Sequence, residues 1–294
     1  MAKQTPSVRM RRLGAQLRKL REERGLNLDQ ASNFLKISKS ALNRMENAQV
    51  TTRAHEVNYI LMMYGIEEDD GLRAAMIGLA TAGRSREWIK RHADVLPSGP
   101  LARDFTRLEQ DSRAIQTYQA NLIPGLLQTK GYARAVMDSV PRPPGSDLRR
   151  ALAFRMARQE VLTRPAPAML DVVLGEAAIR QCLGGPDIMA EQLCYVAETM
   201  TRSNITVRVL PFSVQRNPGV DGAFTMLDVE TGDFTVVVID SLTSSICVED
   251  DRDVRRYGKV FRELQTVACS PSESRRIIEH AAEETHALQQ DPRS

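Results

Sequence analysis

Polar and basic side chains gather in the segment 38–46 at spacings that place them on one side of a helix. Lys39 and Asn43 are four residues apart, with Ser40 beside the first and Arg44 beside the second. These side-chain types can hydrogen-bond to base edges: lysine donates to guanine, asparagine can pair with adenine, and serine adapts to several bases. Arg44 has two other interpretations, a contact with DNA phosphate or an ion pair with a nearby acid such as Glu46. We therefore take Lys39, Ser40, Asn43 and Arg44 as candidate base-contacting residues.

The surrounding N-terminal region is strongly basic. Residues 1–50 contain 11 Lys or Arg and 4 Asp or Glu, a net charge of +7, whereas the whole chain carries only +3 and the remaining 244 residues therefore −4. This uneven distribution favours a polyanion partner at one end of the chain, with a solvated charged tail as the alternative. The basic residues expected to contact phosphate without reading sequence are Arg9, Arg11, Arg12, Arg18 and Lys36.

Two short helices joined by a tight turn must position these side chains. Asn27 can cap a helix over 28–35, and Gln30 completes a capping box. Ser38 can cap a second helix over 39–46, so the pair has the helix-turn-helix pattern. An amphipathic helix over 13–24 precedes them, and the residues expected in the motif's core are Leu17, Ala31, Ser32, Ile37, Leu42 and Met45.

These segments resemble the phage-repressor/Cro-like (XRE) class of helix-turn-helix regulators, through residues 26–31 and 38–46. The resemblance implies that the helix 38–46 lies in the DNA major groove. The sequence departs from the class pattern at three positions: Lys36 replaces a turn glycine, Ser32 a crossing alanine, and Leu28 a glutamine that often contacts the DNA backbone. A left-handed backbone at Lys36 would cost about 1 kcal/mol.

Two further helices complete a five-helix, all-α domain over residues 1–83. Thr52 is expected to cap the fourth helix, and a fifth begins near Leu72 and ends near Gly83. Residues 84–104, which include the turn-forming sequence 97–100, are predicted to be a connector. Trp88 within it is expected to be a packing anchor.

The remaining residues, 105–294, predict an α+β domain. Residues 205–209 alternate between apolar and polar side chains, which indicates a half-buried strand, and the apolar run 234–239 predicts a central strand buried on both faces. Further extended segments are expected at 115–118, 169–174 and 224–229, and helices at 131–140, 147–162, 187–201, 252–267 and from Ser270 onward.

The peptide 122–135, Leu-Ile-Pro-Gly-Leu-Leu-Gln-Thr-Lys-Gly-Tyr-Ala-Arg-Ala, provides a second resemblance. It is similar to a C-terminal regulatory domain found after this helix-turn-helix type in antitoxin-like regulators of high-GC mycelial bacteria. The resemblance implies a transcriptional regulator and a small protein partner encoded next to it. Matching segments lie at 158–162, 173–178, 209–212 and 270–274.

Chemistry-bearing clusters are sparse in this sequence. The four cysteines are far apart, which favours thiols in a reducing cytosol, and Glu176, Asp240 and Glu249 have no spacing typical of an acid–base site. There is no apolar run of about 18 residues. We therefore expect no catalytic, cofactor-binding or metal-binding residues, no membrane partner and a cytoplasmic location.

The sequence thus predicts a DNA-binding transcriptional regulator that acts as a homodimer, because paired half-sites suit a two-fold protein. Its C-terminal domain would dimerise, sense a signal or hold a partner. One alternative is a protein–protein adaptor, or an antitoxin that neutralises a small partner with little DNA binding, which Leu28 and Lys36 favour. Another is an enzyme that the helix-turn-helix targets to DNA.

Overall fold

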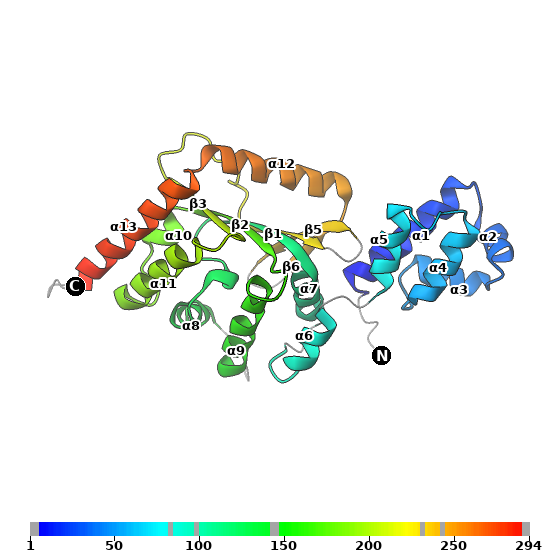
Figure 1. Cartoon of the computed structure of the whole chain (residues 1–294), viewed down its shortest axis with the longest axis horizontal. Helices are drawn as coiled ribbons and strands as arrows, with labels where there is room; N and C mark the ends of the chain where they lie inside the picture. Colours follow the sequence, from blue (N-terminus) through cyan, green and yellow to red (C-terminus); the bar gives the residue numbers. More distant parts are fainter. Residues whose placement is uncertain are drawn as a thin grey trace. The chain divides into compact units, whose positions relative to one another are not determined.

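The computed structural model describes residues 6–81, 85–96, 100–141, 147–229, 233–241 and 245–289 (Figure 1). The chain divides into two compact units. The first takes in residues 1–91, 98–112 and 228–235, and the second takes in residues 92–97, 113–227 and 236–294.

The first unit is helical, as expected for the N-terminal domain. Its helices are α1 (Val8–Glu23), α2 (Leu28–Leu35), α3 (Lys39–Glu46), α4 (Ala54–Met63), α5 (Gly71–Ala80), α6 (Ser85–Arg91) and α7 (Pro100–Asp111).

The first helix begins earlier than its apolar pattern predicts. Ser7 caps α1 by accepting a hydrogen bond from the backbone N–H of Met10, so the helix gains more than one turn before Leu13. Leu13, Leu17 and Leu20 are then buried along one side of it. The predicted apolar face is therefore correct, and only the start of the helix differs.

Two predictions at the ends of α4 and α5 need correction. Arg53, not Thr52, occupies the N-cap of α4, where its backbone N–H donates to the Glu56 carboxylate at 2.6 Å. Thr52 is buried. Helix α5 ends at Ala80, and the predicted end at Gly83 lies outside the described residues.

The segment predicted to be a connector, 84–104, contains α6 and the start of α7. Because this segment is polar and contains turn-forming residues, its sequence shows no clear helical pattern. Trp88, at 3% exposure, is buried in α6, which confirms its expected packing role. Residues 97–99 of the predicted turn lie outside the described residues.

The second unit contains most of a six-stranded sheet. Its elements are β1 (Ser112–Gln119), α8 (Lys130–Asp138), α9 (Leu148–Arg158), β2 (Met169–Gly175), α10 (Ala177–Arg180), α11 (Pro186–Thr199), β3 (Ile205–Leu210), β4 (Phe224–Val229), β5 (Phe234–Asp240), β6 (Ser245–Val248), α12 (Asp251–Val267) and α13 (Pro271–Gln289), with short 3₁₀ turns at Gly125–Leu127 and Gln159–Leu162.

The strand order is β3-β2-β1-β4-β5-β6. Strands β1, β2 and β3 are parallel, with Tyr118 opposite Val173 and Val173 opposite Arg208, whereas β5 and β6 are antiparallel. Parallel neighbours need long connections, and here α8 and α9 join β1 to β2, while α10 and α11 join β2 to β3. The predicted mixture of helices and strands is confirmed.

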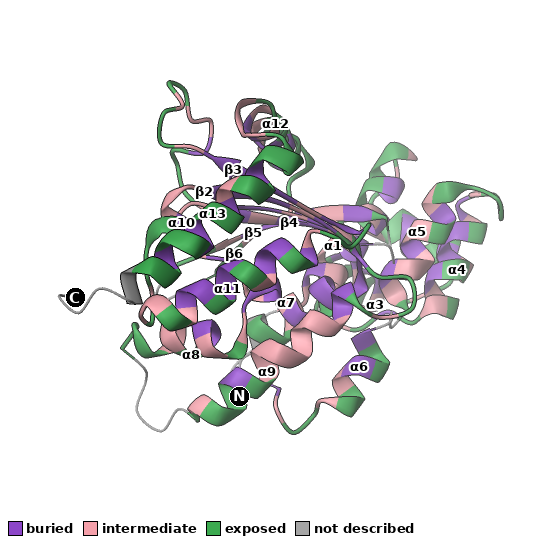
Figure 2. Cartoon of the chain, turned by 60° about the vertical axis from the view of Figure 1, so that its left-hand side comes forward, coloured by how far each residue is buried: buried purple, intermediate pink, exposed green. Residues whose placement is uncertain are grey.

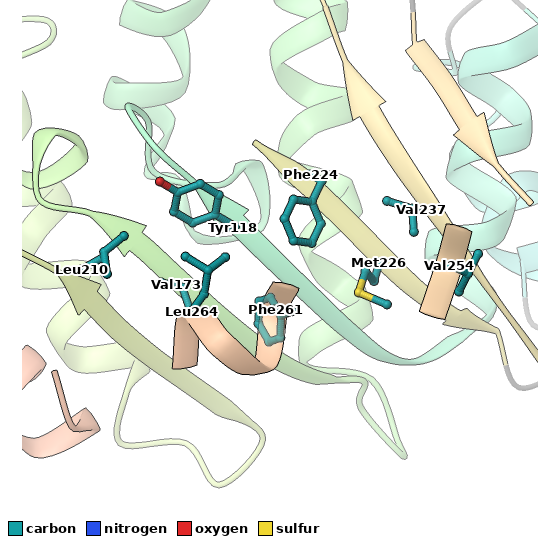
Figure 3. Close-up of a cluster of buried hydrophobic side chains, with 9 residues drawn as sticks. All are labelled: Tyr118, Val173, Leu210, Phe224, Met226, Val237, Val254, Phe261 and Leu264. Atoms are coloured by element: carbon teal, nitrogen blue, oxygen red, sulfur yellow. The ribbon is translucent and has the colours of Figure 1, made fainter. Parts of the chain in front are cut away.

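Helices cover both faces of this sheet (Figures 1 and 2). Helix α12 lies on one side, and α8, α9 and α11 lie on the other. Under α12, Phe261 and Leu264 pack with strand residues of the sheet, and Phe224 contacts Phe261 edge-on with ring centroids 6.4 Å apart. The buried members of this cluster (Figure 3) are Tyr118, Val173, Leu210, Phe224, Met226, Val237, Val254, Phe261 and Leu264.

The individual strand predictions have mixed outcomes. Burial alternates along β3 from Ile205 to Val209, as predicted. The apolar run of β5 is buried at Val236–Val238, but β5 is not central, because it lies between β4 and the edge strand β6. The sequence analysis missed β6, which has only four residues and follows a segment that is not described.

Candidate nucleic-acid interface

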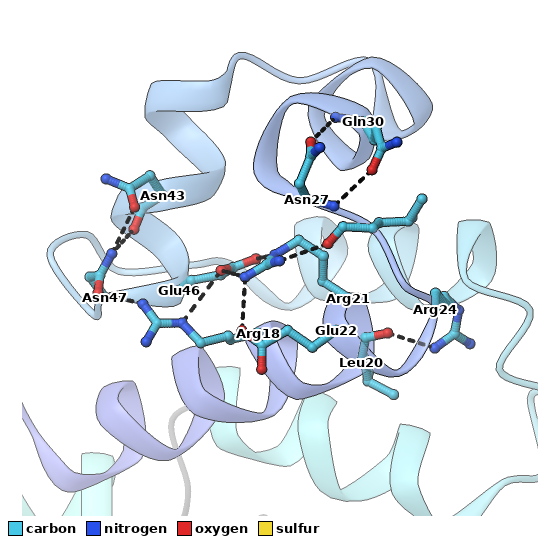
Figure 4. Close-up of polar contacts among 11 residues, drawn as sticks. Arg18, Leu20, Arg21, Glu22, Arg24, Asn27, Gln30, Asn43, Glu46 and Asn47 are labelled. Carbon is cyan, nitrogen blue, oxygen red and sulfur yellow. Dashed lines mark hydrogen bonds and ion pairs between the residues drawn. The ribbon is translucent and has the colours of Figure 1, made fainter.

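The two helices of the predicted helix-turn-helix begin at the expected caps. The side chain of Asn27 accepts from the Gln30 backbone N–H at 2.9 Å, and the Gln30 side chain accepts from the Asn27 N–H at 3.0 Å (Figure 4). Ser38 accepts from the backbone N–H of Ala41 at 3.2 Å. These local bonds satisfy amides that would otherwise lack partners, so α2 and α3 start where the sequence predicts.

The turn between them is left-handed at Lys36, where φ is 54° and ψ is 38°. The backbone N–H of Ile37 donates to the Ser32 carbonyl at 3.1 Å and closes the end of α2. A residue with a Cβ is strained in this conformation. Lys36, at a position that is usually glycine, therefore carries the expected backbone strain of about 1 kcal/mol.

A buried ion pair connects α1 to the end of α3 (Figure 4). The Arg21 guanidinium contacts both carboxylate oxygens of Glu46, Nε to Oε1 at 2.7 Å and Nη2 to Oε2 at 3.0 Å. Arg21 also donates to the Leu26 carbonyl at 2.8 Å, and the hydrogen bond to Glu46 raises the pKa of Arg21. The pair fixes the far end of α3 and resolves one ambiguity, because Glu46 is occupied by Arg21 and does not pair with Arg44.

Gly14 allows α1 to approach α3 closely. A Cβ at this position would lie 2.7 Å from the Glu46 carbonyl oxygen and 2.8 Å from that of Met45. Neither Gly14 nor the Arg21–Glu46 pair is among the residues predicted from the sequence. A glycine inside an otherwise regular amphipathic helix was the available signal, because such a residue often marks close packing.

The predicted core of the motif is largely buried. Leu17, Ala31 and Leu42 are at most 1% exposed. Ser32, in place of the usual alanine, is also buried and donates its hydroxyl to the Asp29 carbonyl at 2.9 Å, so the substitution leaves no unsatisfied hydroxyl. Ile37 and Met45 are half-buried.

The predicted base-contacting residues all lie on the exposed side of α3. The Lys39 ammonium lies 2.8 Å from the Asp29 carboxylate, and both side chains remain more than half exposed. One turn later, Arg44 donates from Nη1 to the Ser40 hydroxyl at 2.5 Å. Exposed pairs of this kind contribute little to stability and can be replaced by contacts with a ligand.

Asn43, the fourth predicted base-contacting residue, belongs to a hydrogen-bonded chain that reaches back to α1 (Figure 4). Asn47 donates from Nδ2 to Asn43 Oδ1 at 2.9 Å and to the Asn43 carbonyl at 2.8 Å. Arg18 in turn donates to Asn47 Oδ1 at 2.8 Å. No pattern in the sequence predicts a role for Asn47.

The predicted phosphate-contacting residues separate into two groups. Arg9 contacts the buried Asp111 carboxylate at 2.6 Å and the Thr81 carbonyl at 2.8 Å, and burial lowers its pKa. The Arg12 guanidinium lies 5.0 Å from the centre of the Phe234 ring. Both face other parts of the first unit, so neither belongs to an exposed surface for phosphate.

Two of the other three predicted phosphate contacts are more accessible. Lys36 is exposed on the turn between α2 and α3, and the Arg18 side chain is 45% exposed beside α3. Arg11 is half-buried and donates to the Pro6 carbonyl. Lys36 and Arg18 therefore flank the exposed side of α3.

Two family models match the sequence. One is described as a helix-turn-helix domain and matches residues 12–76. The other is described as "Domain of unknown function (DUF5753)" and matches residues 102–280, more than half of the chain. The chain belongs to the DUF5753 family. Comparisons with curated proteins and with solved structures give no match.

The helix-turn-helix match gives this DUF5753-family chain an N-terminal DNA-binding module of the kind found in transcriptional regulators. Among the described residues of its C-terminal region, Glu176 and Asp240 have local hydrogen-bond partners. Glu176 accepts from the Phe212 backbone N–H at 2.8 Å, and Asp240 from the Ser245 hydroxyl at 2.5 Å, so these acids act as local hydrogen-bond acceptors.

Two kinds of feature are absent from the described part of this DUF5753-family chain. No group of three or more His, Cys, Asp or Glu side chains is arranged there to hold a metal ion. No helix among these residues has both the length and the apolar character needed to cross a membrane.

Proposed function

We propose that this chain is a sequence-specific transcriptional regulator of the phage-repressor/Cro-like (XRE) class and reads the major groove with α3. One observation carries the proposal. The side of α3 that bears Lys39, Ser40, Asn43 and Arg44 is exposed, while its opposite side is held against α1 by the buried Arg21–Glu46 pair. A reading helix must combine free base-contacting side chains with a fixed position.

The flanking charge supports the same function. Lys36 lies before the start of α3 and Arg18 beside Asn47 after its end, and these two are the phosphate contacts that we retain, with Arg11 as a third. Arg9 and Arg12 are left out, since both are engaged within the first unit. We place the DNA-binding part within residues 1–83 and the regulatory part within 105–294. A DNA target implies a cytoplasmic location.

We further propose a homodimer, because one short reading helix gives little specificity and two half-sites are read by a two-fold protein. The C-terminal unit would provide dimerisation, signal sensing or partner binding.

The antitoxin-like role rests on the peptide 122–135 and its resemblance. In this role the C-terminal unit would bind a small protein encoded next to the chain. Co-purification from the native cell tests it: a stoichiometric small protein supports the role, and a chain that purifies alone contradicts it. Light scattering of the pure chain tests the dimer, which requires twice the mass of one chain.

DNA binding itself is tested by fluorescence anisotropy of the full chain with its own upstream DNA and with random DNA of equal length. Counterion release requires the binding constant to fall steeply with salt on both. The upstream DNA should bind at least about a thousandfold more tightly at physiological salt. Equal binding to both sequences would exclude sequence-specific recognition of the upstream DNA, and no binding to either would favour the adaptor alternative.

A further inference from the structure

The side-chain amide of Asn43 has a defined orientation, which bears on the bases that α3 can read. Its Oδ1 atom is turned toward Asn47 and accepts a hydrogen bond from Asn47 Nδ2 at 2.9 Å (Figure 4). The Nδ2 group, with its two N–H donors, therefore points away from Asn47. An asparagine that pairs with adenine must instead present its oxygen and its nitrogen side by side to the base.

The side-chain amide of Asn47 is held in this orientation, because both its oxygen and its nitrogen are hydrogen-bonded. Its Oδ1 accepts from the Arg18 guanidinium at 2.8 Å, and its Nδ2 donates to the carbonyl oxygen of Asn43 as well as to Oδ1. Arg18 is itself placed by α1, with its Nε 3.7 Å from Glu46 Oε2. Rotation of the Asn47 amide would bring its nitrogen to the Arg18 guanidinium, where donor would face donor.

The other polar groups on the exposed side of α3 are donors too. Lysine and arginine have no acceptor atoms. The Ser40 oxygen accepts from Arg44 at 2.5 Å, so the serine keeps its O–H donor and one acceptor lone pair. Lys39 uses part of its donor capacity on Asp29. We call the outward groups of Lys39, Ser40, Asn43 and Arg44 the α3 donor face.

We infer that the α3 donor face selects guanine, and that Asn47 is the residue that sets this preference by orienting Asn43. Guanine is the base that presents two neighbouring acceptors, N7 and O6, in the major groove. Adenine and cytosine present an amino group in the major groove. That amino group is a hydrogen-bond donor and would face the donors of Lys39, Asn43 and Arg44. The inference rests on the proposed DNA-reading function and differs from the expectation that Asn43 pairs with adenine.

Selection from a randomised duplex library with the full chain tests the inference. The enriched half-site should contain guanines, with guanine favoured over adenine by about tenfold at the position that faces Asn43, which is typical of one good side-chain contact. That position is identified as the one whose preference changes in Asn47→Asp. In this variant the carboxylate accepts from Asn43 Nδ2, so the Asn43 oxygen turns outward and the preference should move from guanine to adenine or cytosine.

Asn33→Asp is the matched control, since Asn33 is exposed on α2, outside this hydrogen-bonded chain, and the charge change is the same. It should weaken binding without altering base preference. Asn43→Asp is a second, independent variant, because an acceptor at position 43 should favour cytosine. Circular dichroism confirms that each variant is folded.

The outcomes separate the two proposals. A half-site without guanine, or Asn47→Asp and Asn43→Asp profiles identical to that of Asn33→Asp, overturns the inference and leaves the proposed function intact. Failure of the unmodified chain to enrich any sequence overturns both. A guanine-containing half-site whose preference changes in both variants, and not in the control, supports the inference.

Discussion

The Arg21 guanidinium and the Glu46 carboxylate form a two-point ion pair that joins α1 to the last residue of α3, and both side chains are less than 10% exposed. Twenty-five positions separate them along the chain. Because the pair lies at the end of the helix that we propose as the reading helix, its loss should affect both folding and DNA recognition.

We expect Glu46→Gln to lower the free energy of unfolding by about 3 kcal/mol, because Arg21 would keep its buried charge without a counter-charge. Urea unfolding followed by circular dichroism measures the change. The double variant Arg21→Met with Glu46→Met should recover much of the loss, since removing both charges leaves neither unpaired. Equal losses in the single and double variants would argue that packing, not charge, dominates at this site.

Gly14→Ala should destabilise the chain by about 2 kcal/mol or more, although alanine is the better helix former. The reason is the backbone of Glu46 and Met45, which lies within 2.8 Å of the new Cβ and cannot move without shifting α3. Gly71→Ala is the control, because nothing lies within 4 Å of a Cβ there. A Gly14→Ala variant as stable as Gly71→Ala would show that α1 and α3 are not in close contact.

Lys36→Gly should stabilise the chain by about 0.5–1 kcal/mol, since glycine relieves the left-handed strain but adds freedom to the unfolded chain. The thermal midpoint and urea unfolding both report this gain. Lys36→Ala retains the strain and should show none of it. If alanine stabilised as much as glycine, the effect would come from the lost charge rather than from the backbone.

The same residue provides a test of the phosphate contacts. Lys36→Ala should reduce the slope of log binding constant against log salt by about 0.9, the loss of one phosphate contact. Arg9→Ala, which removes a guanidinium engaged by Asp111, should leave the slope unchanged. Anisotropy titrations on random DNA measure both. A reduced slope for Arg9→Ala would return that residue to the phosphate-contacting set.

Asp171 should make the stability of the sheet depend on pH. Burial raises its pKa, against the opposing effects of Arg208 at 2.7 Å and of Gln265. The folded chain therefore holds this proton to a higher pH than the unfolded chain does. The free energy of unfolding falls as the pH rises from about 4 through the raised pKa.

Asp171→Asn removes that contribution, so its stability relative to the unmodified chain should increase as the pH rises through this window. Urea unfolding at a series of pH values measures the difference, with Asp221→Asn, which removes an exposed carboxylate, as the control. A constant difference across the window would show that burial does not perturb Asp171.

Much of the fold could be read from the sequence because it depends on neighbouring residues. Caps such as Asn27 and Ser38 act within one turn, so they specify where α2 and α3 begin. Alternating side chains specify a strand such as β3 for the same reason. Short elements without such signals were missed, among them β6 and α6. The order of the six strands depends on pairing between distant segments and left no local pattern.

For the candidate site, too, local sequence predicted one part and tertiary contacts decided the other. The sequence alone determined which residues form the helix-turn-helix and which side chains α3 exposes, because helical periodicity assigns each residue to a face. Only the tertiary structure decided the partners of those residues. In the folded chain, Arg9 pairs with Asp111 and Arg21 pairs with Glu46. Asn47, which is hydrogen-bonded to Arg18, orients the side chain of Asn43. An arginine can reach many acids, and only the folded backbone determines which one lies within hydrogen-bonding distance.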